Sequence, residues 1–217
     1  RKGEGMSQVY DQLSEAILGG NLKGIKKLTQ AAVDGGASAQ EVLDLGLFPG
    51  MDEVGVLFKT GAMFIPEVLL SAKTMAAAMD VLKPLLVQGG GSGRGTVVIG
   101  TVQGDLHNIG KNLVAMMLEG AGFTVIDLGI DVKPQAFLDA VKQHKPILLG
   151  MSALLTTTMP RMGETIRALD EAGVRSQVKV MVGGAPVTEE FVKKISADAY
   201  AANAGTAVDV AKALVAG

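Results

Sequence analysis

The chain has 217 residues, a formal net charge of −2 and no cysteine. Its small net charge gives no electrostatic reason to expect a nucleic acid or an anionic membrane as a partner. The absence of cysteine excludes disulfides, zinc–cysteine sites, iron–sulfur clusters and thiol nucleophiles. The apolar runs are far shorter than the about 20 residues that span a bilayer, and no secretory segment opens the sequence. We therefore expect a cytoplasmic protein.

Residues 7–87 show the spacing of apolar residues that is typical of amphipathic helices, and four helices are predicted there. Asn21 is the predicted N-cap of the second helix. Ser38 with Glu41 fits a capping box at the start of the third, and Pro66 suits the first turn of the fourth. Because the connections are short, the N-terminal region is predicted to be a small four-helix bundle.

Residues 88–95 read QGGGSGRG, which is the composition of a flexible linker. We place the domain boundary there, between a helical domain at residues 7–87 and a second domain at residues 96–217. Apolar residues make up 48% of the chain, and the length suits two small domains, so we expect a buried core in each.

The second half alternates apolar, β-branched runs with helical segments. The predicted strands cover residues 96–101, 123–129, 146–152, 178–184 and 198–202. The predicted helices cover residues 109–120, 134–144, 160–172, 188–195 and 205–215. Five such alternations predict an α/β domain with a five-stranded parallel sheet and helices on both faces.

Polar or glycine-containing turns follow four of these strands, at residues 103–108, 152–156, 183–186 and 201–205. The carboxyl ends of parallel strands share one edge of a sheet, which is where ligands bind in such folds. The turns supply one imidazole, one carboxylate, a few hydroxyls and much bare backbone. No Ser–His–Asp order for acyl transfer is evident. The set instead favours a large, flat or tailed ligand held against small residues.

His107 lies two residues after Asp105 in the first of these turns. A carboxylate that accepts the proton of one ring nitrogen leaves the other nitrogen free for a metal. A single histidine does not make a closed zinc site, which has about four protein ligands. A metal held by a macrocycle, such as cobalt in a corrin or iron in haem, needs only an axial ligand. A purely structural His–Asp pair is the alternative interpretation.

Three motifs resemble the signature of the cobalamin-binding domain, and their spacing matches it: DLHNIG at 105–110, SAL at 152–154 and GG at 183–184. The helical half resembles the cap module that accompanies this domain in methionine synthase. It is still more similar to the free-standing corrinoid proteins of methanol, methylamine, glycine-betaine and methoxyaromatic methyltransferase systems, with residues 61–75 resembling their cap segment. The resemblance covers nearly the whole chain. It implies a four-helix cap bundle followed by a Rossmann-like (flavodoxin-like) cobalamin-binding domain.

The resemblance also implies roles for individual residues. His107 would replace the cofactor's own benzimidazole as the lower cobalt ligand, and Asp105 would hydrogen-bond its other ring nitrogen. Ser152 would support that link or contact the displaced nucleotide tail. The residues implied to touch the corrin ring or its amides are Gly104, Asn108 and Ile109, and Leu106 and Gly110 are implied to bind the cofactor as well. Those implied to line or close the slot for the tail are Leu154, Thr156, Gly183, Gly184 and Ala204. Those implied to cover the upper face from the cap are Met63, Phe64 and Leu69.

The function implied is that of a methyl carrier, a non-autonomous subunit of a methyltransferase system. Its cofactor would be cobalamin or a related cobamide that alternates between cob(I)alamin and methylcob(III)alamin. A substrate:corrinoid methyltransferase would supply the methyl group. A methylcorrinoid:acceptor methyltransferase would pass it to tetrahydrofolate or to a thiol, and a reductive activase is a further candidate partner.

Three alternatives remain open at the level of sequence. The first is a cobalamin-dependent sensor or regulator; light-sensing versions carry a DNA-binding module ahead of the cap and usually a tryptophan in the cap, and neither is seen here. A mutase-type subunit would not need a cap. A receiver-like or flavodoxin-like module without cobalt would want a cluster of acids at the strand ends, where Asp105 stands largely alone.

Overall fold

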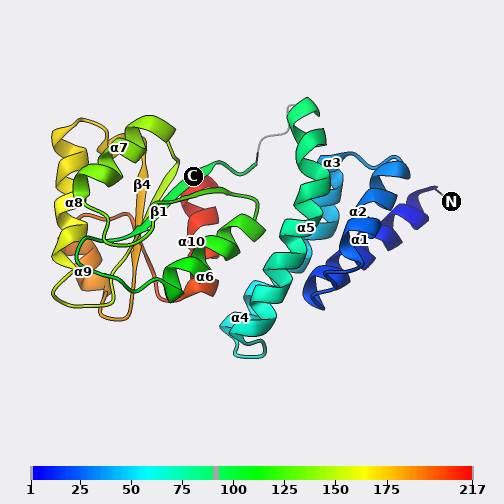
Figure 1. Cartoon of the computed structure of the whole chain (residues 1–217), viewed down its shortest axis with the longest axis horizontal. Coiled ribbons are helices and arrows are strands. Elements are labelled where there is room, and N and C mark those ends of the chain that lie inside the picture. Colours follow the sequence, from blue (N-terminus) through cyan, green and yellow to red (C-terminus); the bar gives the residue numbers. More distant parts are fainter. Residues whose placement is uncertain (1, 90–92, 217) are drawn as a thin grey trace. The chain divides into compact units, whose positions relative to one another are not determined.

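The computed structural model describes residues 2–89 and 93–216 (Figure 1). The chain divides into two compact units, Arg1–Gly93 with Glu119–Gly122, and Arg94–Leu118 with Phe123–Gly217. Of the helices described, none is both long enough and apolar enough to cross a bilayer.

The first unit consists of helices (Figure 1). Its elements are α1 (Lys2–Leu18), α2 (Ile25–Asp34), α3 (Ala39–Glu41), the π-helical segment η1 (Val42–Leu47), α4 (Phe48–Lys59) and α5 (Ile65–Gly89). Since α3, η1 and α4 follow one another without a break, they form one continuous helical run. The described part of this unit is therefore a bundle of four helical segments, as predicted.

Local signals for the helix starts were mostly correct. The capping box is confirmed, because the Ser38 hydroxyl accepts a hydrogen bond from the Glu41 amide while the Glu41 carboxylate accepts one from the Ser38 amide. Pro66 lies in the first turn of α5, as predicted. The assignment of Asn21 was wrong: α2 begins after Gly24, and the Asn21 side chain accepts from the Gly24 amide at 3.0 Å. Asn21 thus closes the turn that precedes the helix.

The predicted linker at residues 88–95 is described only in part. Helix α5 continues through Gly89, so its last two residues fall within that segment. Residues 90–92 lie outside the described residues. The division between the two compact units comes after Gly93.

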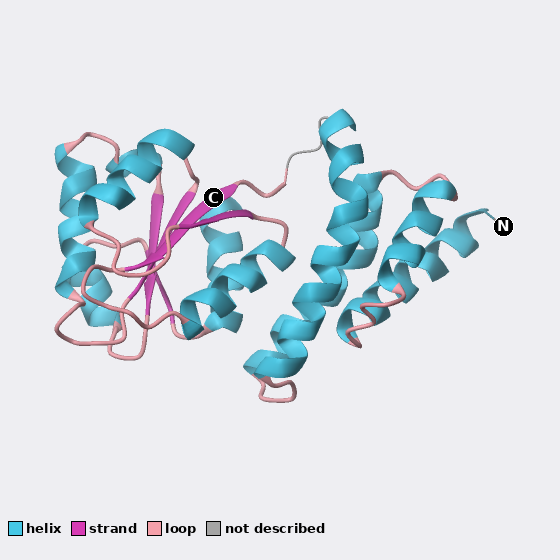
Figure 2. Cartoon of the chain, in the orientation of Figure 1, coloured by secondary structure: helices cyan, strands magenta, loops and turns pink. Residues whose placement is uncertain are grey.

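The second unit is an α/β domain (Figure 2). Its strands are β1 (Thr96–Thr101), β2 (Thr124–Asp127), β3 (Leu148–Ser152), β4 (Lys179–Gly183) and β5 (Ala199–Ala201). Its α-helices are α6 (Ile109–Gly120), α7 (Pro134–His144), α8 (Pro160–Glu171), α9 (Glu189–Lys194) and α10 (Ala204–Ala216). Each predicted strand and helix is present, and all strand pairs are parallel, so the predicted fold class is confirmed.

The strand order, β2-β1-β3-β4-β5, determines where the site can form. Helices α7, α8 and α9 lie on one side of the sheet and α6 and α10 on the other (Figure 1). Strand β1 is buried along almost its whole length, as expected for a strand covered on both faces. The chain leaves β1 toward β2 and leaves β3 toward β4, so the connections diverge between two adjacent strands. In such sheets the crevice at this switch point is the usual place for a ligand.

Candidate functional site

The loop after β1 turns the carboxylate of Asp105 into the protein. Gly104 has φ +83, a left-handed conformation that glycine adopts without steric cost. The Val102 amide donates to the Ser152 carbonyl oxygen at 3.0 Å, which joins this loop to the end of β3. Asp105 follows with no exposed surface. A buried carboxylate is costly unless hydrogen bonds replace its water, so its partners decide the local structure.

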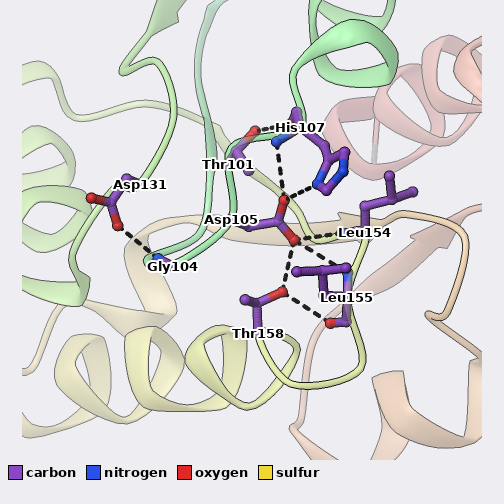
Figure 3. A network of polar contacts seen from close by, with 8 residues as sticks. All are labelled: Thr101, Gly104, Asp105, His107, Asp131, Leu154, Leu155 and Thr158. Atoms are coloured by element: carbon purple, nitrogen blue, oxygen red, sulfur yellow. Dashed lines mark hydrogen bonds and ion pairs between the residues drawn. The ribbon is translucent and has the colours of Figure 1, made fainter.

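Five hydrogen bonds reach the Asp105 carboxylate (Figure 3). One oxygen, Oδ2, accepts from the Leu154 amide at 2.8 Å, the Leu155 amide at 3.2 Å and the Thr158 hydroxyl at 2.7 Å. The other, Oδ1, lies 3.1 Å from the His107 amide and 2.8 Å from His107 Nδ1. The carboxylate is therefore shared between the loop after β3 and the histidine of its own loop.

These contacts keep Asp105 ionised and fix which ring nitrogen of His107 faces it. Burial raises the pKa of Asp105, but the hydrogen bonds from Thr158, the Leu154 amide and His107 outweigh it and hold that pKa well below its usual range. An ionised carboxylate only accepts hydrogen bonds, so His107 Nδ1 must carry the proton. In the neutral imidazole the opposite ring nitrogen, Nε2, then has the free lone pair, and this is the tautomer that metal-binding histidines use.

The backbone of His107 is held as well as its ring. Its carbonyl oxygen accepts from the buried hydroxyl of Thr101, at the end of β1, at 2.9 Å (Figure 3). The side chain is nevertheless half exposed. The imidazole is thus fixed at its backbone and at Nδ1 while part of the ring stays open to an approaching group.

Large apolar side chains close to His107 in sequence or in contact with Asp105 are exposed. The exposed fractions are 66% for Leu106, 77% for Ile109 and 42% for each of Leu154 and Leu155. Exposed apolar side chains close to a polar group are typical of a surface that binds a ligand, and less so of a surface that stays in contact with water. The remaining predicted residues of this loop, Gly104, Asn108 and Gly110, are exposed too.

Glycines 183 and 184 bring three strand ends together. A Cβ at Gly184, where φ is +129, would lie 1.8 Å from the Ala153 carbonyl oxygen. A Cβ at Gly183 would lie 2.8 Å from the Ala201 carbonyl oxygen. Both positions therefore require the absence of a side chain for backbone approach at the carboxyl edge of the sheet. Nearby at this edge Ala204 is buried and Thr156 exposed.

The structure adds Thr158 to the candidate site, which the sequence analysis missed. The hydroxyl that reaches Asp105 belongs to Thr158, whereas Ser152 is half-buried and supplies its carbonyl oxygen to the Val102 amide. The available signal was the threonine run 156–158, which follows the strand next to β1. The role that the resemblance implies for Ser152 stays a prediction.

The three cap residues belong to the first unit. Met63 is buried and Phe64 is exposed in the connection between α4 and α5, and Leu69 is half-buried on α5. The Phe64 amide donates to the Glu67 carboxylate at 2.8 Å, which caps α5. Their place above a cofactor stays a prediction.

The donor set fits a metal that brings its own equatorial ligands. Within the described residues, no three His, Cys, Asp or Glu side chains gather as a metal site. The arrangement instead offers one fixed imidazole nitrogen in loops whose large apolar side chains are exposed. This is what a metal in a large, largely apolar macrocycle requires of a protein.

Comparisons with known proteins agree with this fit. Two family models, each described as a B12 binding domain, match residues 9–83 and 95–214. Both units thus have the features of a B12-binding protein. A dimethylamine corrinoid protein of Methanosarcina acetivorans is 43% identical over 95% of this chain and 99% of its own length. A trimethylamine corrinoid protein of Methanosarcina mazei is 45% identical over 86% of this chain and 87% of its own.

Solved structures give the same result. The methanol:cobalamin methyltransferase complex of Methanosarcina barkeri matches with a TM-score of 0.84 and 34% identity, over 96% of this chain and 80% of that one. A cobalamin-binding protein of Desulfitobacterium hafniense matches with a TM-score of 0.79 and 34% identity, over 94% and 98%. The chain belongs to the family of B12-binding corrinoid proteins. The predicted resemblance and the cobamide cofactor with its cobalt are confirmed.

Removing the Thr158 hydroxyl tests the network around Asp105. Thr158→Val keeps the shape of the side chain but leaves the buried carboxylate with one donor fewer. We expect a loss of about 1.5–3 kcal/mol in the free energy of unfolding, the usual range for a hydrogen bond to a charged group. Tyr10 and Tyr200 are the only tyrosines and tryptophan is absent, so urea unfolding in a Tyr10→Phe background reports the second unit through Tyr200.

Thr157 supplies the matched control, because it is exposed and adjacent. Thr157→Val should change the free energy of unfolding by no more than about 0.5 kcal/mol. Equal effects of the two substitutions would show that the Thr158 contact does not stabilise the buried carboxylate.

Gly184→Ala tests the close approach of the strand ends. The added methyl group would collide with the Ala153 carbonyl oxygen in a backbone region that side chains rarely adopt. We expect the free energy of unfolding to fall by about 3 kcal/mol or more in the same assay. Gly173→Ala is the control, because Gly173 has φ +71 but no atom within 4 Å of the added Cβ. Its cost should be about 1–2 kcal/mol of backbone strain alone, and an equal cost at Gly184 would refute the collision.

Proposed function

We propose that this chain is a methyl carrier that works between two partner methyltransferases. The observation that carries the proposal is the Asp105–His107 pair, which presents Nε2 beside exposed apolar side chains. When bound, the cobamide supplies a cobalt ion that takes up a methyl group and gives it away. The names of the similar proteins, dimethylamine and trimethylamine corrinoid proteins, support a methylated amine as the donor.

In this proposal His107 would coordinate the cobalt through Nε2. Asp105 keeps the proton on Nδ1 and fixes the plane of the ring. The donors from Leu154, Leu155 and Thr158 fix Asp105 in turn. The ligand is therefore oriented before the cofactor arrives, which lowers the entropic cost of binding.

Other residues of the carboxyl edge would bind the rest of the cofactor. Leu106 and Ile109 are exposed and suit contact with the corrin, and Gly104, Asn108 and Gly110 leave backbone near its amides. We assign the nucleotide tail to the neighbouring strand ends, whose residues are Ser152, Leu154, Thr156, Gly183, Gly184 and Ala204. From the helical unit, we assign Met63, Phe64 and Leu69 to the opposite face of the cofactor. Apolar side chains there would exclude water from the methyl group.

The partners follow from the chemistry. A substrate:corrinoid methyltransferase would deliver the methyl group of the amine. A second methyltransferase would present tetrahydrofolate or a thiol as the acceptor, and a reductive activase would restore cobalt that has become oxidised. A similar chain in the solved methanol:cobalamin methyltransferase complex supports such an assembly.

A donor panel tests the proposal. The chain loaded with reduced cobalamin is mixed with each methylated-amine methyltransferase and its amine, and methylation is followed by the visible spectrum. We expect uptake with dimethylamine or trimethylamine, then transfer to tetrahydrofolate or a thiol once the matching second enzyme is added. His107→Ala should lower the rate of uptake at least about tenfold, because the cofactor loses its orienting ligand.

His144→Ala is the control for this experiment. His144 is the other histidine, and it is exposed at the end of α7, at the edge of the sheet where β3 begins. The rate of methyl uptake by His144→Ala should equal that of the wild type. Stable binding of cobalamin with no methyl uptake from any amine would contradict the amine donor, and no uptake from methanol, glycine betaine or a methoxyaromatic compound either would contradict the carrier role and favour a sensor.

A further inference from the structure

The loop that presents His107 is attached to the fold on two sides, and only one of them involves the Asp105 carboxylate. On that side, the loop after β3 donates to the carboxylate. On the other side, the loop between β2 and α7 binds the backbone (Figure 3). The following inference concerns this second attachment and rests on the proposed role of His107.

Asp131 makes the second attachment with two hydrogen bonds. Its side-chain Oδ1 accepts from the Gly104 amide at 2.7 Å, and its own amide donates to the Asp105 carbonyl oxygen at 3.1 Å. Together these bonds hold the residue pair Gly104–Asp105 from both ends. This pair immediately precedes the segment that carries His107, so its orientation sets the direction in which the loop leaves β1.

The backbone of Asp131 is strained where it makes these two hydrogen bonds. Its φ is +54, a left-handed conformation that costs a side-chain-bearing residue about 1–2 kcal/mol and that aspartate and asparagine tolerate best. The residues around it are fixed by the sheet, because the Val132 amide donates to the Thr101 carbonyl oxygen and Val132 pairs with Val102. Strain that neighbouring structure maintains is concentrated at functional positions.

Burial does not explain the choice of an aspartate here. Asp131 is exposed, so its carboxylate fills no core position. Its polar contact is to the amide of Gly104, a residue that itself needs φ +83. A hydrogen bond from a backbone amide to a carboxylate is stronger than one to a neutral acceptor. It therefore holds the glycine turn in one of the many conformations open to glycine.

We propose that Asp131 is a positioning residue for the cobalt ligand. It locks the Gly104–Asp105 turn from the side opposite to Thr158, and so fixes the direction in which His107 presents Nε2. Its effect passes through the loop backbone, without contact with the cofactor.

Three substitutions separate the effect of the Asp131 acceptor oxygen from the effect of its left-handed backbone. Asp131→Asn keeps an acceptor oxygen and tolerates the left-handed backbone. Asp131→Gly keeps the backbone conformation and removes the acceptor. Asp131→Ala loses both. Lys145→Gly is the matched control, because Lys145 also has positive φ, 46°, but lies at the end of α7.

The first readout uses the apo chain and needs no cofactor. By NMR, the Gly104 amide should exchange with solvent at least about tenfold faster in Asp131→Gly, and the proton on His107 Nδ1 should exchange faster too. Asp131→Asn should stay within about twofold of the wild type, and Lys145→Gly should not change either signal. In Asp131→Gly the relief of about 1–2 kcal/mol of backbone strain offsets part of the lost hydrogen bond, so its melting temperature should lie above that of Asp131→Ala, which loses the acceptor and keeps the strain. If Asp131 contributed only stability, exchange at Gly104 would follow the melting temperature and be faster in Asp131→Ala than in Asp131→Gly.

The second readout is the dissociation constant for cobalamin, measured by titration. It should rise at least about tenfold in Asp131→Gly and recover in Asp131→Asn. Unchanged exchange and unchanged affinity in Asp131→Gly would overturn the positioning role. Failure of the proposed function is distinguishable, because it would appear as wild-type methyl transfer in His107→Ala, whatever the Asp131 variants do in the apo chain.

Discussion

The buried carboxylate of Asp105 is the interaction on which the rest of the site depends. An ion without exposed surface is tolerable only when donors replace its hydration, and Asp105 has them from two backbone amides and a hydroxyl after β3, and from His107. Because these donors come from the loop after β1 and the loop after β3, the hydrogen bonds hold both loops in place. It also leaves the histidine with one defined tautomer, which turns a flexible side chain into an oriented ligand.

The strand order explains why such a group can form here. Strands β1 and β3 are neighbours although β2 comes between them in sequence, so their loops meet at the switch point of the sheet. A carboxylate after β1 thereby reaches amides about fifty residues later. The glycines at 183 and 184 let the next strand approach closely, which keeps this edge free of side chains. The strand order therefore places the candidate binding surface and the histidine at the same edge of the sheet.

The sequence predicted what is local and missed what is distant. Strand β1 and the capping box at Ser38 were found because period and spacing are written in neighbouring residues. The π-helical segment 42–47 gave no such signal, and Asn21 was misassigned because its oxygen closes a turn one step before the helix. Thr158 and Asp131 escaped because their partners lie in other loops. The histidine was predicted from chemistry and resemblance together, and its geometry came only from the fold.

The most direct measurement of the central claim is electron paramagnetic resonance of the cobalt(II) form, loaded into protein grown with nitrogen-15 histidine. The chain has only two histidines, so the assignment needs only two variants. The account predicts that labelling changes the nitrogen hyperfine splitting in the wild type and in His144→Ala, and leaves it unchanged in His107→Ala. A splitting that does not respond to labelling in the wild type would mean that the lower ligand is not a protein imidazole, and would contradict the account.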